Sequence, residues 1–153
     1  MKKIILLIML IVCTHLYCQA QEAPYKSAVG LLVWNGFGAS FKTFIKDRSA
    51  IELRGYFDKN GTRITGLLQF HGEVAGINGL LWYAGPGAHV AFYKLGGAKQ
   101  SSTFVGIDGV IGIDYKFNET PIDLFLDWQP TYEFGNSRGA YISWGGMGIR
   151  YTF

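Results

Sequence analysis

The sequence predicts an all-β fold, namely an eight-stranded antiparallel up-and-down transmembrane β-barrel that follows a cleaved signal peptide. Three observations predict it: an export-type N-terminus, eight short segments of alternating hydropathy, and a terminal segment with one wholly apolar face. In the terminal segment, Met147, Ile149, Tyr151 and Phe153 share the apolar face. Arg150 lies on the opposite face, as expected for a wall between lipid and a polar lumen.

The N-terminal residues have the pattern of an export signal. Two lysines precede residues 4–12, an apolar run that is too short to span a bilayer as a permanent helix. Ala20 ends an acceptable small-x-small cleavage site. We therefore expect a signal peptide at 1–20 and one barrel domain at 21–153.

Signal removal changes the composition of the chain. Both cysteines precede the cleavage site, so the mature chain has no disulfide, zinc–thiolate site or cysteine nucleophile. The loss of two lysines leaves 12 basic and 11 acidic residues, so the formal charge of +3 gives no argument for a nucleic-acid partner. The 21 glycines and 16% aromatic content, without an apolar run near ~20 residues, indicate many short strands.

Each predicted strand is an alternating segment bounded by turn-forming residues rich in Gly, Asn, Asp and Ser. In chain order, the segments are 26–35, 37–45, 50–58, 63–73, 80–94, 102–117, 121–134 and 140–153. The alternation is clearest in the sixth and seventh segments, where apolar residues at every second position are separated by aspartates. Within the fifth segment, Gly85-Pro86-Gly87 predicts a bulge or bend that lets the wall curve.

The charged residues test whether the apolar faces can meet lipid. Thirteen charges fall on the polar faces and form a predicted lumen network: Lys42, Glu52, Arg54, Asp58, Arg63, Glu73, Asp108, Asp114, Lys116, Asp123, Asp127, Glu133 and Arg150. The other ten mature charges fall in turns or at strand ends. A charge on the lipid face would cost about 2–4 kcal/mol at the bilayer midplane, so this distribution is the one that lipid requires.

Aromatic residues gather near both ends of the predicted strands, as expected for the two interfaces of a membrane. One rim holds Trp82, Tyr115, Phe117, Tyr151 and Phe153, and the other holds Trp34, Phe37, Phe57, Phe92, Tyr132 and Phe134. A soluble barrel or sandwich would place the apolar face inside, and alternation alone does not separate the two. The aromatic rims and the paired lumen charges favour lipid.

The export signal, the alternating segments and the terminal Tyr151-Thr152-Phe153 resemble the small eight-stranded outer-membrane barrels of the OmpX and OmpA-transmembrane-domain type. The chain also resembles short outer-membrane barrel proteins of unassigned function, through Gly-Ile-Asp-Gly at 106–109 and Asp-Trp-Gln-Pro at 127–130. The resemblance implies that Ile149, Tyr151 and Phe153 form the signal read by the barrel-assembly machinery. It also implies location in the cell outer membrane.

The even strand number predicts that both termini face the periplasm. Hairpins around residues 36, 60, 98 and 136 should then face outward, and those around 47, 77 and 119 should face the periplasm. The outer loops are also short, which leaves little loop surface for an adhesin.

An eight-stranded barrel is only wide enough inside for side chains or one small ligand. The sequence therefore predicts a structural, membrane-integrity barrel with a side-chain-filled interior, and the alternatives are a small-solute or ligand-binding barrel and a lipid-modifying enzyme. His71 and His89 fall on the lumen face. Neither has a serine two residues later, so the His-x-Ser motif of the lipid A deacylase barrel is missing. The lipid A palmitoyltransferase barrel has prolines that open a lateral gate for lipid. Pro86 and Pro130 of this chain lie on predicted strands that are not neighbours, so they do not suggest such a gate.

We accordingly expect no catalytic, cofactor-binding or metal-binding residues. The expected partners are outer-membrane lipid and, during biogenesis, the barrel-assembly machinery. We expect a monomer, and we expect no nucleic-acid partner.

Overall fold

The computed structural model of the chain describes residues 23–59, 61–94, 101–134 and 139–153. The predicted signal peptide and the central residues of the predicted turns at 60, 98 and 136 lie outside the described residues. The strands are β1 (Ser27–Val33), β2 (Phe37–Lys46), β3 (Ser49–Phe57), β4 (Gly61–Glu73), β5 (Leu80–Lys94), β6 (Ser101–Lys116), β7 (Ile122–Trp128), β8 (Thr131–Phe134), β9 (Ala140–Tyr141) and β10 (Gly145–Thr152). Among these residues, no helix is long and apolar enough to cross a membrane.

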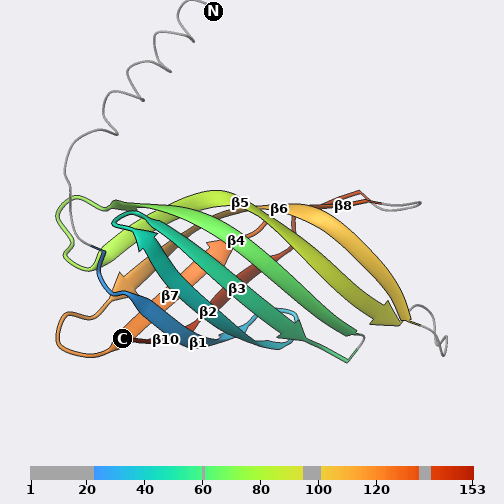
Figure 1. Cartoon of the computed structure of the whole chain (residues 1–153), viewed down its shortest axis with the longest axis horizontal. Helices are drawn as coiled ribbons and strands as arrows, with labels where there is room; N and C mark the ends of the chain where they lie inside the picture. The colour runs from blue at the N-terminus through green and yellow to red at the C-terminus, as the bar shows by residue number, and fades with distance from the viewer. Residues whose placement is uncertain (1–22, 60, 95–100, 135–138) are drawn as a thin grey trace, which may run out of the picture.

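The strands form one closed antiparallel barrel. Each strand from β1 to β6 pairs with the next along the chain, β7 pairs with β6 and β10, and β10 returns to β1. The closing register runs from Ala28↔Thr152 to Val33↔Met147, so the last strand meets the first, as a closed up-and-down barrel requires. Figure 1 shows the strands tilted around a common interior, with the C-terminus at the end where β4 joins β5 and β6 joins β7.

Strands β7 and β8 are two halves of one wall strand, because both pair with β6 in a single continuous register. The ladder is interrupted at residues 129–130, where Pro130 has no N–H to donate. The Gly109 N–H still donates to the Pro130 carbonyl at 2.9 Å, so the interruption removes one bond and leaves the wall closed.

Strands β9 and β10 are also two halves of one wall strand, separated by a bulge. Residues 142–144 lie opposite only residues 129–130, and the register shifts by one residue across them. Two carbonyls of the bulge accept indole N–H bonds, one from Trp128 at 2.6 Å and one from Trp34 at 2.7 Å. The ten elements therefore make eight wall strands, which confirms the predicted eight-stranded up-and-down barrel.

Of the bulge or bend predicted at Gly85-Pro86-Gly87, the structure contains no bulge. The pairs Leu67↔Gly87 and Phe70↔Ala84 enclose two residues on each strand, so no extra residue is inserted. Pro86 instead interrupts the ladder with β4, because it offers no N–H to that strand. The backbones also approach closely here, since a Cβ at Gly85 would lie 1.8 Å from the Leu68 carbonyl oxygen.

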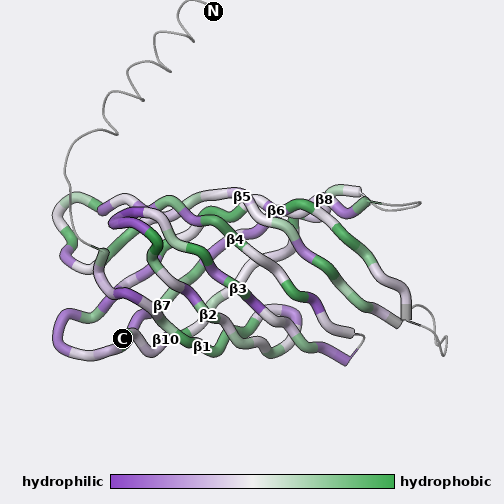
Figure 2. Tube along the Cα trace, viewed as in Figure 1, coloured by the Kyte–Doolittle hydropathy of each residue, from purple (hydrophilic) through white to green (hydrophobic). Residues whose placement is uncertain are grey.

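The two faces of the wall differ sharply in chemistry. In β3, for example, the side chains of Glu52, Arg54 and Tyr56 are buried inside the barrel, and Ile51 and Leu53 are exposed on its outer surface. Figure 2 shows hydrophilic and hydrophobic residues alternating along the strands. The interior is therefore mainly polar and the exterior mainly apolar, as the sequence pattern predicts.

Inward-facing glycines provide the space that large interior side chains occupy. A Cβ at Gly112 would lie 2.5 Å from the Asp127 Cβ and 2.8 Å from the Tyr83 Cζ. A Cβ at Gly146 would lie 3.1 Å from an Arg54 terminal nitrogen. The barrel thus compensates for large side chains on one strand with bare backbone on another.

We predict that Gly112→Val destabilises the barrel by about 1–3 kcal/mol, because its side chain would overpack the interior against Asp127 and Tyr83. The matched control is Gly66→Val, since a Cβ at Gly66 meets nothing within 4 Å. Urea unfolding in detergent micelles, followed by tryptophan fluorescence, measures both variants. Similar unfolding midpoints for the two would contradict the packing role of Gly112.

Candidate functional site

The interior of the barrel holds most of the predicted lumen charges. Ten of the thirteen are buried: Lys42, Glu52, Arg54, Arg63, Asp108, Asp114, Asp123, Asp127, Glu133 and Arg150. Six carboxylates therefore meet four cations, and the two histidines of the described chain, His71 and His89, are buried beside them. Burial of so many charges demands mutual pairing, because each unpaired ion would lose its hydration without compensation.

The other three predicted lumen charges lie at the strand ends rather than inside. Asp58 and Glu73 are exposed, and Asp58 accepts a 2.8 Å hydrogen bond from the Gly61 N–H. Lys116 is half-buried, and its ammonium donates to the carbonyls of Phe117 at 2.6 Å and Thr120 at 2.8 Å. These residues follow the alternation, but they lie where the wall no longer encloses them.

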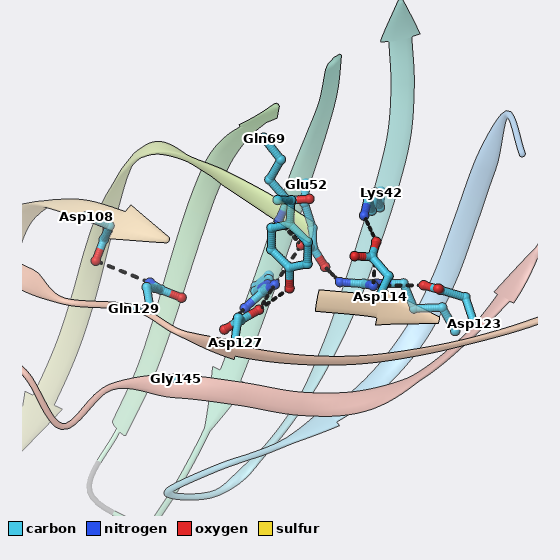
Figure 3. Close-up of polar contacts among 12 residues, drawn as sticks. Lys42, Glu52, Gln69, Asp108, Asp114, Asp123, Asp127, Gln129 and Gly145 are labelled. Atoms are coloured by element: carbon cyan, nitrogen blue, oxygen red, sulfur yellow. Dashed lines mark hydrogen bonds and ion pairs between the residues drawn. The ribbon is translucent and has the colours of Figure 1, made fainter. Parts of the chain in front are cut away.

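Glu52 is the centre of the largest group of contacts. Its carboxylate accepts bonds of 2.7 Å from Arg54, from Arg150 and from the Gln69 amide. Arg150 also donates to Asp123 at 2.9 Å. Figure 3 shows how side chains from several strands converge around Glu52.

Arg54 joins Glu52 to the opposite side of the barrel. Its two terminal nitrogens donate to the two Asp127 oxygens at 3.1 and 2.6 Å, which is the bidentate geometry favoured by a guanidinium and a carboxylate. The Tyr83 hydroxyl donates to Asp127 at 2.6 Å. The Phe125 ring lies 5.2 Å from the Arg54 guanidinium carbon and 3.6 Å from that of Arg150, so it packs against both cations.

The end of the interior nearest the C-terminus holds a second ion pair, between Lys42 and Asp114. Asp114 also lies 3.8 Å from Arg150 and 3.6 Å from the His71 Nε2 atom. Tyr25, which precedes β1, donates its hydroxyl to Asp123 at 3.4 Å. Burial, together with the Asp123 carboxylate, raises the pKa of the Tyr25 phenol well above its ordinary value.

A separate cluster lies near the opposite end, around Arg63. Arg63 pairs with Asp108 and reaches the His89 Nδ1 atom at 3.1 Å and the Thr131 hydroxyl at 3.2 Å. The His89 Nδ1 atom lies 2.9 Å from Asp108, and its Nε2 atom lies 3.6 Å from Glu133. The Trp144 ring covers the Arg63 guanidinium at 4.3 Å.

The His89 cluster lacks the geometry of nucleophilic catalysis. A catalytic histidine contacts the nucleophile with one ring nitrogen and the orienting carboxylate with the other. Here both Asp108, at 2.9 Å, and Thr131, at 3.3 Å, lie against the same Nδ1 atom. Within the described residues, no group of three or more His, Cys, Asp and Glu side chains could hold a metal ion.

Several interior residues were not in the predicted network. Gln69, Tyr83 and Phe125 all contact its charges, and Tyr25 lies outside any predicted strand. Their positions follow the same alternation as the charges, so strand parity could have found the first three. Phe125 was overlooked because it is an apolar residue on a polar face.

The two ends of the interior differ in the volume of their cavities. At the end near the C-terminus, a cavity of about 430 Å³ opens beside His71. At the other end, the space between Tyr56, Arg63 and Trp144 belongs to a cavity of only about 10 Å³. Side chains therefore fill the section between His71 and Trp144.

The chain matches no protein-family model and no curated protein. Among solved structures, it is similar to the crystal structure of the N-terminal β-barrel domain of Pseudomonas aeruginosa OprF, with a TM-score of 0.65 and 16% sequence identity. The match covers 87% of this chain and 100% of that chain. At this identity the likeness concerns the fold, which is the barrel expected from the resemblance to small outer-membrane barrels.

We predict that Arg54→Met destabilises the barrel by about 3–5 kcal/mol, because it leaves Asp127 and Glu52 short of a buried cation. Lys46→Met, at an exposed position of β2, is the matched control and should change stability by less than about 0.5 kcal/mol. The double variant Arg54→Met/Asp127→Leu should lose less than the sum of its single variants. Urea unfolding midpoints measure the stability of Arg54→Met, Asp127→Leu, the double variant and Lys46→Met. If the losses of the two single variants add up in the double variant, Arg54 and Asp127 are not coupled.

Proposed function

We propose that the chain is an integral barrel of the bacterial outer membrane, with a structural, membrane-integrity role and an interior closed by charged side chains. The observation that carries the proposal is the reversal of normal burial. Thirty large hydrophobic side chains are exposed on the described residues, while arginines, lysine and carboxylates are fully enclosed. A water-soluble monomer rarely exposes large contiguous apolar patches, whereas lipid requires one.

Strand length and aromatic placement support the same proposal. A tilted membrane strand needs about 9–11 residues, and β2 to β6 have between 9 and 16. Phe37 and Phe57 are directly paired and exposed near one end, and Tyr151 and Phe153 are exposed at the other. Such side chains suit the two interfaces of a bilayer.

Membrane orientation follows from the strand number in this proposal. The turns at 47–48, 74–79 and 117–121 share one end of the barrel with the C-terminus, and we assign that end to the periplasm. Ile149, Tyr151 and Phe153 point outward on the closing strand, with exposed fractions of 47, 57 and 62%. Their outward direction on the closing strand suits recognition by the barrel-assembly machinery.

The interior contacts favour a structural barrel over a pore. A series of ion pairs links opposite walls and runs in the order Lys42, Asp114, Arg150, Glu52, Arg54 and Asp127. The pair between Arg63 and Asp108 continues the obstruction toward the other end. Opening a water-filled path would break several charge-assisted bonds together, each worth roughly 1.5–3 kcal/mol. The closed interior thus serves stability rather than transport.

Membrane fractionation and electrophoresis test the proposal together. We predict that the chain resists alkaline extraction from outer membranes and migrates faster in SDS unless it is heated. Planar-bilayer recording should detect no discrete conductance. Recovery of folded chain from detergent-free periplasm would contradict the membrane assignment, and regular conductance steps abolished by Arg150→Ala would replace the structural role with transport.

A further inference from the structure

His89 lies in a buried cluster of charged side chains at the end of the barrel away from the C-terminus. The charged partners that the described residues place against its ring are Arg63 on β4, Asp108 on β6 and Glu133 on β8. The histidine and these three partners are at most 6% exposed. Charges enclosed in this way must be balanced by one another, because bulk water does not reach them.

The cluster has one carboxylate too many while His89 is neutral. Arg63 supplies one positive charge, whereas Asp108 and Glu133 supply two negative charges. The balance closes when the imidazole takes up a second proton and becomes positive. An uncompensated buried carboxylate is costly, so the enclosure itself favours the charged imidazole.

The two ring nitrogens of His89 face different carboxylates. The Nδ1 atom lies 2.9 Å from the Asp108 Oδ2 atom, and the Nε2 atom lies 3.6 Å from the Glu133 Oε1 atom. A neutral imidazole has one N–H and one lone pair, so either tautomer would aim a lone pair at a carboxylate. The imidazolium, which has two N–H groups, offers a donor to both.

Arg63 has acceptors other than the imidazole. One of its terminal nitrogens lies 3.1 Å from the His89 Nδ1 atom, but the same nitrogen donates to the Asp108 Oδ1 atom and, at 3.2 Å, to Thr131. The Gln129 amide also donates to Oδ1, at 3.2 Å (Figure 3), whereas Oδ2 faces His89. Loss of the Nδ1 proton would change this division, since Arg63 could then donate to the bare nitrogen.

Gly106 makes room for the ring between the two carboxylates. It lies directly between His89 and Glu133 in the wall, since it pairs with both. A Cβ at this position would lie 2.4 Å from the His89 Cε1 atom and 3.0 Å from Nε2. The segment Gly-Ile-Asp-Gly at 106–109 therefore supplies both the space for the imidazole and the Asp108 carboxylate.

We propose that His89 is a proton-binding site, held as an imidazolium between Asp108 and Glu133, and that its proton fastens β8 to β5 and β6. Strand β8 has four residues and follows the ladder interruption at 129–130, so its attachment depends on side-chain contacts more than that of a longer strand. Removal of the proton leaves Glu133 facing a lone pair and weakens the attachment. The site requires only the folded barrel, so its test is independent of membrane location and conductance.

The proposed site makes the stability of the barrel depend on pH. In an unfolded chain, a histidine loses its proton near pH 6.5, and both carboxylates are ionised above about pH 5. Above about pH 6.5, the folded chain then holds one proton more than the unfolded chain. The unfolding equilibrium constant therefore rises by up to tenfold per pH unit until the folded site also releases its proton, so stability falls as the pH rises.

Nitrogen-15 NMR of the histidine-labelled mature chain in detergent micelles tests the proposal, because imidazolium and neutral imidazole differ in their nitrogen shifts. The expected mature chain contains two histidines, and His71→Gln identifies the signals of His89. At pH 7.5 an ordinary histidine is about nine-tenths neutral, whereas His89 is expected to be an imidazolium. Glu133→Gln should make it neutral at this pH. The matched control, Glu73→Gln, removes an exposed carboxylate at the other end of the barrel and should leave the imidazolium unchanged.

Urea unfolding of the wild-type chain and of Glu133→Gln between pH 6 and pH 8 measures the consequence for stability. The unfolding equilibrium constant of the wild-type chain should rise with pH several-fold more than that of the variant. Two neutral histidines at pH 7.5 in the wild-type chain would overturn the proposal, as would an imidazolium that persists in Glu133→Gln or an equal pH dependence of the two chains. The first of these results needs no variant, so it decides the matter even if a substituted chain does not fold.

Discussion

The contacts of Glu52 with Arg54 and Arg150 are the interaction on which the rest of the structure depends. The two arginines carry bonds from β3 and β10 to Asp127 and Asp123 on β7, so one carboxylate connects three wall strands. Charges enclosed in this way are stable only when each finds a partner of opposite sign with good geometry. The network therefore determines which residues the neighbouring strands can present inward.

The wall is adapted to the volume of this network. Glycines at 112 and 146 leave room for Tyr83, Asp127 and Arg54, and a rigid ring, Phe125, packs against both arginines. The wall is irregular at Pro130 and at the bulge in the terminal strand, where indole N–H groups satisfy the freed carbonyls. The barrel thus remains closed where its ladder is broken, as an apolar surrounding requires.

Alternating hydropathy predicted the barrel and the burial of ten charges, because the inner and outer faces of a barrel wall impose opposite requirements on adjacent residues. It did not predict that Asp58, Glu73 and Lys116 lie outside the enclosed section, since parity gives a side chain's direction but not its depth. Of the bulge or bend expected at Gly85-Pro86-Gly87, the bulge is absent, since a proline can remove one ladder bond without changing the register. Pairing partners depend on strand stagger, and an isolated sequence does not encode stagger in any simple pattern.

The inside-out arrangement of charge and apolar surface is tested most directly by single-cysteine nitroxide labelling in liposomes. Both native cysteines precede the expected mature chain, so single sites can be introduced at outward-facing Ile107 and Ile111 of β6 and at exposed Lys59 as a reference. The account predicts that labels at Ile107 and Ile111 relax strongly with oxygen and weakly with a water-soluble nickel chelate, with the opposite response at Lys59. Strong relaxation of the two β6 labels by the nickel chelate would contradict it.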